Sequence, residues 1–273
     1  MTTKILFTDL DGTLLDDDKN VSEKDLSSIN DMLGAGHRLV IATGRPIYSA
    51  RVVAHELGLY RDGIFICASN GGVIYDCGTE KIIHAATLDM DTVDILFKAA
   101  GEEGLHIHTY TDDHVVSLRE TAELKGYCQR IKMPYRLLKS IPGDLPARPP
   151  KLIVMSIKEN SRRILEDFEA RHAKEVEGRC VSVFSNDFLL EYLPVGVSKG
   201  NGVKMLCSLL DIPVADTVAA GDEANDIPML DAAGIGCVMA NGTEETKAHA
   251  DYVTKKTNNE SGVSEIIEKF FML

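Results

Sequence analysis

The hydrophobic positions in the first seventy residues recur with two alternating periods. Short apolar runs at residues 4–7, 38–42 and 64–68 are typical of buried strands. Between these runs, apolar residues recur every three or four positions over residues 26–33 and 47–57, which predicts two amphipathic helices. Strands that alternate with helices pair in parallel through right-handed crossovers. The pattern therefore predicts an α/β fold with a Rossmann-like parallel sheet.

From about residue 85 the pattern changes. Strand-like segments are expected at 106–110, 115–118, 151–157, 181–184 and 189–192, and helices at 90–103 and 162–172. The alternation of strand and helix then resumes, with a helix expected at 202–210 and a strand at 217–220. This order predicts a core made of residues 1–84 and 194–273, interrupted by a large inserted α+β domain at residues 85–193.

Composition narrows the possible partners. The chain has 273 residues and a formal net charge of −13, which argues against nucleic acid or an anionic membrane as a partner. No apolar stretch approaches the ~20 residues of a membrane helix, and the first residues lack a signal-peptide pattern. The six cysteines are scattered without metal-binding spacing. We expect reduced thiols in a cytoplasmic protein.

Two aspartates follow the first expected strand. Asp9 and Asp11 lie on either side of Leu10, and Gly12 permits a sharp turn behind them. Ligands of open α/β sheets bind at the carboxyl ends of strands. Two close carboxylates repel each other unless a cation or a shared proton offsets the charge, and oxygen ligands suit Mg²⁺. The pair therefore predicts a magnesium site, whereas the run at residues 16–18 reads as an acidic, solvated turn.

Three further segments place reactive groups at expected strand or helix ends. They are Thr43-Gly44-Arg45, Lys199, and the run from Gly221 to Asp226. Together with Asp9 and Asp11 they supply a nucleophile, a second acid, a hydroxyl, backbone donors, a cation and further metal ligands. That set fits phosphoryl transfer, in which catalysis is mostly positioning and charge stabilisation.

On these motifs the chain resembles the haloacid dehalogenase-like (HAD) phosphatases, and more narrowly the Cof-like sugar-phosphate phosphatases. The resemblance covers nearly the whole chain, and the inserted domain matches the cap of that family in position and size. It rests on residues 9–14 (DLDGTL), 42–45 (ATGR), 196–200 (GVSKG), 221–230 (GDEANDIPML) and 250–254 (ADYVT).

The resemblance implies a mechanism. Asp9 would attack phosphorus and form an aspartyl-phosphate, and Asp11 would act as general acid and then as general base. The side chains of Asp9 and Asp222 and the backbone carbonyl of Asp11 would hold Mg²⁺. The substrate would be a small phosphorylated metabolite, with a sugar phosphate as the first choice.

The resemblance also assigns the groups around the phosphate. Hydrogen bonds to its oxygens would come from Thr43, from the backbone N–H groups of Gly44 and Leu10, and from Asn225, while Lys199 would add a positive charge. Several roles stay open. Arg45 would bind substrate or pair with a neighbouring acid, and Asp226 would orient the loop or a metal-bound water or merely cap a helix.

The turn Ser69-Asn70-Gly71-Gly72 departs from the Glu-Asn-Gly of many relatives. There the turn faces the leaving group, so Asn70 would contact substrate and the change would alter which substrates fit.

Other readings are compatible with parts of the pattern. A phosphomutase on the same fold would pass the phosphoryl group to a second sugar hydroxyl. A receiver-like phosphoacceptor would keep the acids without rapid turnover, but Asp11 and the inserted domain disfavour it. An idle regulator is disfavoured because every catalytic position of the pattern is filled. His106, His108 and the Asp112–His114 run resemble a metal cluster, but Mg²⁺ rarely uses imidazole, so we read them as structural or substrate-facing.

Overall fold

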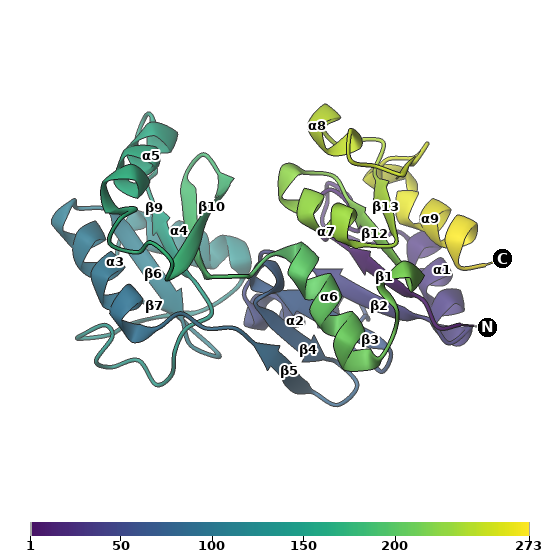
Figure 1. The fold of residues 1–273 in the computed structure, drawn as a ribbon, viewed down its shortest axis with the longest axis horizontal. Coiled ribbons are helices and arrows are strands. Elements are labelled where there is room, and N and C mark those ends of the chain that lie inside the picture. The colour runs from purple at the N-terminus through teal and green to yellow at the C-terminus, as the bar shows by residue number, and fades with distance from the viewer. Residues whose placement is uncertain (1, 273) are drawn as a thin grey trace. The chain divides into compact units, whose positions relative to one another are not determined.

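The computed structural model describes residues 2–272. Figure 1 shows the chain in sequence colours. It divides into two compact units, one made of residues 2–44, 53–84 and 198–272 and the other of residues 45–52 and 85–197. These units differ from the domains expected from the sequence at two places: residues 45–52 and 194–197, which were expected in the core, are grouped with the second unit.

The first unit is built on a sheet of eight strands in the order β14-β13-β12-β1-β2-β3-β4-β5. The six strands from β14 to β3 pair in parallel, as the sequence predicts, and β4 pairs antiparallel with β3. The strands are β1 (Ile5–Thr8), β2 (Arg38–Ala42), β3 (Ile64–Ala68), β4 (Val73–Asp76), β5 (Lys81–Ala85), β12 (Thr217–Gly221), β13 (Ile235–Val238) and β14 (Tyr252–Val253).

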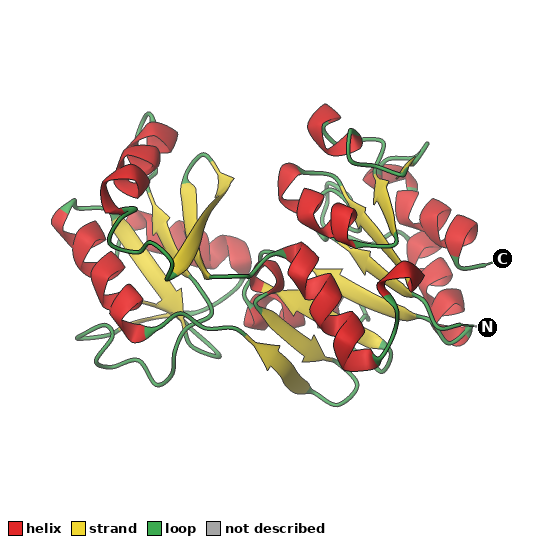
Figure 2. Ribbon diagram, viewed as in Figure 1, coloured by secondary structure: helices red, strands yellow, loops and turns green. Residues whose placement is uncertain are grey.

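Helices accompany these strands (Figure 2). Alternate residues of β1, Ile5 and Phe7, pack in one buried cluster with Val203 and Leu206 of α6 and Met229 of α7. The helices are α1 (Glu23–Gly34), α2 (Ile47–Glu56), α6 (Lys199–Leu210), α7 (Ile227–Ala232), α8 (Glu244–Lys247) and α9 (Gly262–Phe270), with short 3-10 turns η1 (Ser69–Gly71), η2 (Val214–Asp216), η3 (Ala224–Asp226) and η4 (Asn258–Glu260).

The start of α1 shows how local sequence sets a helix boundary. The Ser22 side chain accepts a hydrogen bond from the Asp25 N–H, as expected of an N-cap. None of the helices within residues 2–272 is long and apolar enough to cross a membrane.

The second unit holds a sheet of six strands in the order β10-β11-β9-β6-β7-β8. Val93 of α3 and Leu165 of α5 belong to one buried cluster, and Tyr127 of α4 belongs to another. The elements are α3 (Met90–Glu102), β6 (His106–Tyr110), β7 (Val115–Ser117), α4 (Ala122–Ile131), β8 (Tyr135–Leu137), β9 (Leu152–Met155), α5 (Ser161–His172), β10 (Cys180–Asn186) and β11 (Leu189–Pro194).

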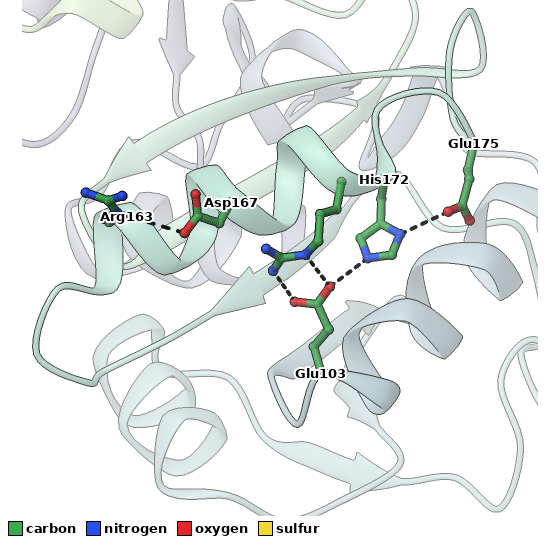
Figure 3. A network of polar contacts seen from close by, with 6 residues as sticks. Glu103, Arg163, Asp167, His172 and Glu175 are labelled. Carbon is green, nitrogen blue, oxygen red and sulfur yellow. Dashed lines mark hydrogen bonds and ion pairs between the residues drawn. The ribbon is translucent and has the colours of Figure 1, made fainter.

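A polar network at the surface joins the loop after α3 to α5 (Figure 3). The Glu103 carboxylate accepts hydrogen bonds from Arg171, at 2.5 and 2.9 Å, and from His172, at 2.9 Å. A second surface pair, Arg163–Asp167, lies one turn earlier on α5. Exposed pairs of this kind contribute little individually, so the buried clusters carry most of the stability of this unit.

Two corrections to the expected elements follow. Helix α6 begins at Lys199 rather than Gly202, because the Ser198 side chain caps it by accepting from Asn201 N–H at 3.1 Å. Residues 122–131 form α4, which the sequence analysis did not anticipate, although Thr121 accepts from Leu124 N–H as a regular N-cap.

Candidate active site

Asp9 lies at the carboxyl end of β1, where two neighbouring strands deliver acids to one place. Its backbone N–H donates to the carbonyl of Ala220 in β12 at 3.0 Å. Because β1 and β12 run parallel and end together, Asp222, two residues beyond Ala220, emerges beside Asp9. Both side chains are largely buried. The expected meeting of acids at this sheet edge is therefore present.

Lys199 joins two of the acids. Its Nζ atom lies 2.5 Å from a carboxylate oxygen of Asp9 and 2.5 Å from one of Asp226. The lysine is 2% exposed, so this pairing is shielded from water. Burial by itself lowers the pKa of Lys199, but the two carboxylates raise it above its usual value. Lys199 therefore stays positively charged, and its two ion pairs hold the ammonium group in place.

Asp226 organises the loop that carries Asp222. Its second carboxylate oxygen accepts the backbone N–H groups of Asp222, at 3.0 Å, and Glu223, at 3.3 Å. It also takes part in a capping box with Glu223. Of the roles left open by the sequence, these contacts favour orienting the loop, because the Asp226 side chain makes no capping hydrogen bond to α7. The other carboxylate oxygen contacts Lys199.

Two residues that support the site were not assigned a role from the sequence. Thr13 donates its hydroxyl to a carboxylate oxygen of Asp222 at 2.6 Å, and Asn241 donates its amide to the Gly12 carbonyl at 2.8 Å. The place of Thr13 in the DLDGT motif was a usable signal. Asn241 lies more than two hundred residues from Gly12 in sequence, and nothing local marked that contact.

The described residues contain one cluster of three side chains able to hold a metal ion, formed by Asp9, Asp222 and Asp226, whose ligand oxygens lie within 4.8 Å of one another. Burial raises the pKa of Asp9 to about 7, against the opposing attraction of Lys199. Burial likewise raises the pKa of Asp222 to about 6, against the hydrogen bond from Thr13. Crowded buried carboxylates facing one ammonium group are unfavourable as anions unless a further cation is present. An all-oxygen donor set fits Mg²⁺.

Asp11 differs from Asp9 in its surroundings. Its side chain is 44% exposed and accepts from Lys19 Nζ at 2.9 Å. The backbone turns sharply behind it, with Gly12 at a φ of +85°. Asp11 is thus solvent-facing beside a buried neighbour, an arrangement in which two close acids can hold different protonation states.

Thr43 and Asn70 meet at the ends of β2 and β3. The Thr43 N–H donates to the Cys67 carbonyl at 2.9 Å, and the Asn70 N–H donates to the Thr43 carbonyl at 3.1 Å. The Asn70 side chain lies against Gly44, since a Cβ atom on that glycine would be 3.1 Å from Asn70 Oδ1. The structure therefore brings these three predicted residues together.

For the remaining predicted site residues, the structure gives a position, and their roles in binding phosphate or substrate stay predictions. Leu10 is buried, and its carbonyl accepts from Leu15 N–H at 2.8 Å. Asn225 lies exposed on η3. Arg45 belongs to the second unit, and its role stays a prediction. His106 and His108 are buried and hydrogen-bonded to each other at 3.0 Å, which confirms a structural reading.

Comparison with known proteins agrees with this fold and site. A sequence model of the haloacid dehalogenase-like hydrolases matches residues 6–267. The Bacillus subtilis protein YxeH is 28% identical over 98% of both chains. A second Bacillus subtilis protein, the 5-amino-6-(5-phospho-D-ribitylamino)uracil phosphatase YwtE, is 26% identical over 97% of both.

Solved structures give the same result. The crystal structure of a haloacid dehalogenase-like hydrolase from Bacteroides thetaiotaomicron is similar with a TM-score of 0.89 and 29% identity, covering 99% of this chain and 100% of the other. The family match, the parallel sheet and the acids at its strand ends agree, so the chain belongs to the haloacid dehalogenase-like hydrolases and is a phosphatase.

Proposed function

We propose that this protein is a Mg²⁺-dependent phosphomonoesterase that hydrolyses small phosphorylated metabolites, with sugar phosphates as the substrate class. The observation that carries the proposal is the contact of Lys199 with both Asp9 and Asp226 next to Asp222. A buried cation held among three carboxylates stabilises the ionised acid that must attack phosphorus.

Asp9 is the proposed nucleophile. A carboxylate oxygen of Asp9 forms a bond to phosphorus while the bond from phosphorus to the leaving oxygen breaks, which gives an aspartyl-phosphate. Lys199 favours the ionised form of Asp9 through its 2.5 Å contact. The hydrogen bond from the Asp9 N–H to β12 fixes the backbone from which the attack occurs.

Asp11 is the proposed general acid and base. Its proton passes to the leaving oxygen, and the resulting carboxylate then takes a proton from the water that attacks the phospho-enzyme. Its exposed side chain can exchange protons with solvent between these steps. The Lys19 ammonium group lies 2.9 Å from this carboxylate.

Asp9 and Asp222, with the backbone carbonyl of Asp11, would hold the metal. Mg²⁺ bound there would offset charge on the transferring phosphoryl group. Asp226 positions this set by holding the backbone of Asp222, and Thr13 orients the Asp222 carboxylate. Thr43, Gly44, Leu10 and Asn225 would bind phosphate oxygens.

The proposed substrate class rests on the resemblance and on one relative, YwtE. YwtE is named for a phosphate ester of a ribityl chain, which is a small polyol phosphate. The net charge of −13 disfavours polyanionic macromolecules, so a small ester is the fitting substrate. The inserted domain, which includes most of the second unit, is proposed to select among such esters.

The proposed location is the cytoplasm. All six cysteines are free thiols, and five of them are buried. Free thiols are usual in a reducing compartment, whereas exported domains more often form disulfides.

The test is phosphate release from a panel of sugar phosphates, polyol phosphates and other phosphometabolites, with Mg²⁺ or with EDTA. We expect Mg²⁺-dependent release by the natural chain and none by Asp9→Asn. An exchange of phosphate between sugar positions without release would indicate a mutase instead. If the protein binds Mg²⁺ but neither releases phosphate nor exchanges it between sugar positions, the proposed phosphatase activity on these esters is wrong.

A further inference from the structure

The first turn of α6, which carries Lys199, is packed against the β3–η1 segment with no room for a side chain. A Cβ atom added to Gly202 would lie 2.5 Å from Cys67 Sγ and 3.2 Å from the Cα atom of Gly71. Real side-chain carbons do not approach that closely, so the helix or Cys67 would have to move. Gly202 therefore permits this close approach.

The opposite side of the same turn is equally crowded. A Cβ atom on Gly200 would overlap the Pro228 carbonyl of α7 and lie 3.3 Å from the Ala232 Cβ atom. Residues two apart on a helix point to nearly opposite sides. The turn is therefore held between the β3–η1 segment on one side and α7, which follows directly after Asp226, on the other.

The η1 turn is adapted to the same contact. Ser69, Asn70 and Gly71 have successive positive φ angles of 51°, 58° and 96°. A Cβ atom on Gly71 would overlap the carbonyl oxygen of Ser198, the residue that caps α6. Left-handed backbone at two non-glycine residues in succession costs free energy and persists only where the surroundings hold it.

This packing fixes the place from which Lys199 reaches its partners. The ammonium group contacts Asp9 and Asp226 at 2.5 Å each, so a displacement of α6 changes both contacts. Misplacement of about 1 Å in a catalytic group can cost 100-fold in rate. The glycines thus couple helix packing to the geometry of the acids.

We propose that Gly202 and Gly71 are positioning residues that place Lys199 between Asp9 and Asp226, a proposal that rests on the proposed phosphatase mechanism. They touch no reacting atom. They act by letting α6 lie against Cys67 and the η1 turn.

The main test is Gly202→Ala together with Cys67→Ala. At a temperature where each variant is folded, Gly202→Ala should lower kcat about tenfold or more, with a smaller change in KM. The double variant should recover most of the loss, because the sulfur atom nearest the added methyl group is gone. Gly34→Ala is the matched control: Gly34 lies in the last turn of α1 with nothing within 4 Å of an added Cβ atom, so its kcat should be unchanged.

A second comparison asks whether the effect passes through Lys199. In a Lys199→Met background, Gly202→Ala should cause no further loss of residual activity. Equal losses in both backgrounds, or failure of Cys67→Ala to restore kcat, would overturn the proposal. If the natural chain releases no phosphate, the proposed function has failed. The packing can then still be tested by the unfolding free energies of four proteins: the natural chain, Gly202→Ala, Cys67→Ala and the double variant. If the effects of the two substitutions on this free energy are additive, the close contact between Gly202 and Cys67 is refuted.

Discussion

The ammonium group of Lys199 lies 2.5 Å from the carboxylate of Asp9, although the two residues are 190 positions apart in sequence. The same nitrogen contacts Asp226, which in turn holds the backbone of Asp222. One buried lysine thus connects the ends of β1 and β12 with the start of α6.

Replacing Lys199 by methionine should lower kcat by about 100-fold or more, because Asp9 and Asp226 lose the cation that favours their ionised forms. The free energy of unfolding should also fall, by about 3–5 kcal/mol, since buried charges are left unpaired. Phosphate release and urea unfolding measure the two effects. Lys204→Met, an exposed lysine on the same helix, is the control and should change neither. Near-normal kcat in Lys199→Met would contradict the assigned role.

Thr13→Val should weaken Mg²⁺ binding by about 10- to 100-fold, because Asp222 loses the hydroxyl that orients its carboxylate. The loss of that hydrogen bond should also raise the pKa of Asp222 above its value of about 6, so the deficit should grow as pH falls. Calorimetric titration with Mg²⁺ at several pH values measures the loss of affinity and its dependence on pH. Thr217→Val removes a buried threonine hydroxyl at the far end of β12 and should leave the affinity unchanged. Equal affinities for Thr13→Val and the natural chain would refute the contact's role.

The second unit should lose stability in mild acid. Burial lowers the pKa of His106 to about 4 and holds that of His108 well below its usual value. Unfolding raises both toward the ordinary value of about 6.5. The unfolded chain therefore binds protons more tightly, and stability present above pH 6.5 is lost as the pH falls toward 4.

His106→Gln removes one of the two buried groups that take up a proton on unfolding. Its unfolding free energy should fall less steeply between pH 6.5 and 4.5 than that of the natural chain, by up to about 1.4 kcal/mol per pH unit. Urea unfolding at several pH values gives the slopes. His249→Gln, at a partly exposed histidine paired with Asp231, should keep the natural slope. Identical slopes in all three proteins would rule out His106 as the source.

A buried ion pair in the second unit should matter more than the surface network of Figure 3. Lys151 Nζ lies 2.7 Å from Glu191, and both side chains are no more than 5% exposed. Glu191→Gln should cost about 3–5 kcal/mol, because it removes the carboxylate charge that lies 2.7 Å from a buried ammonium group. Glu103→Gln, in the surface network, should cost about 1 kcal/mol or less. Chemical denaturation that ranks the two variants the other way would contradict this.

Much of the core was predictable because its signals are local. Buried strands such as 38–42 are continuous apolar runs. Acids directly after strand ends are weak signals singly, but together with Thr43 and Lys199 they indicate a site. Asp9 and Asp222 therefore came from the sequence, and parallel pairing of β1 with β12 explains why they meet.

The misses have tertiary causes. Gly200 and Gly202 weaken the intrinsic helix signal of α6, so the start at Lys199, which the Ser198 cap sets, was predicted three residues too late. Helix α4 is short, and its buried face, which includes Leu124, Tyr127 and Ile131, is mixed with polar residues. Asn241 acts through a contact with Gly12 across more than two hundred positions, which no local pattern encodes. Thr13, by contrast, was marked by its place in the DLDGT motif, although its contact with Asp222 is equally distant in sequence.

Asp9 is expected to carry the phosphoryl group during turnover. The most direct measurement is rapid acid quenching of Asp11→Asn during turnover of p-nitrophenyl phosphate, followed by mass spectrometry of the peptide that contains residue 9. The nitrophenolate leaves without needing a proton, whereas attack by water lacks its base, so the intermediate should accumulate. We expect one phosphoryl group on Asp9 of the Asp11→Asn protein and none on the Asp9→Asn protein. A phosphoryl group on another residue, or turnover with no phospho-enzyme in either protein, would contradict it.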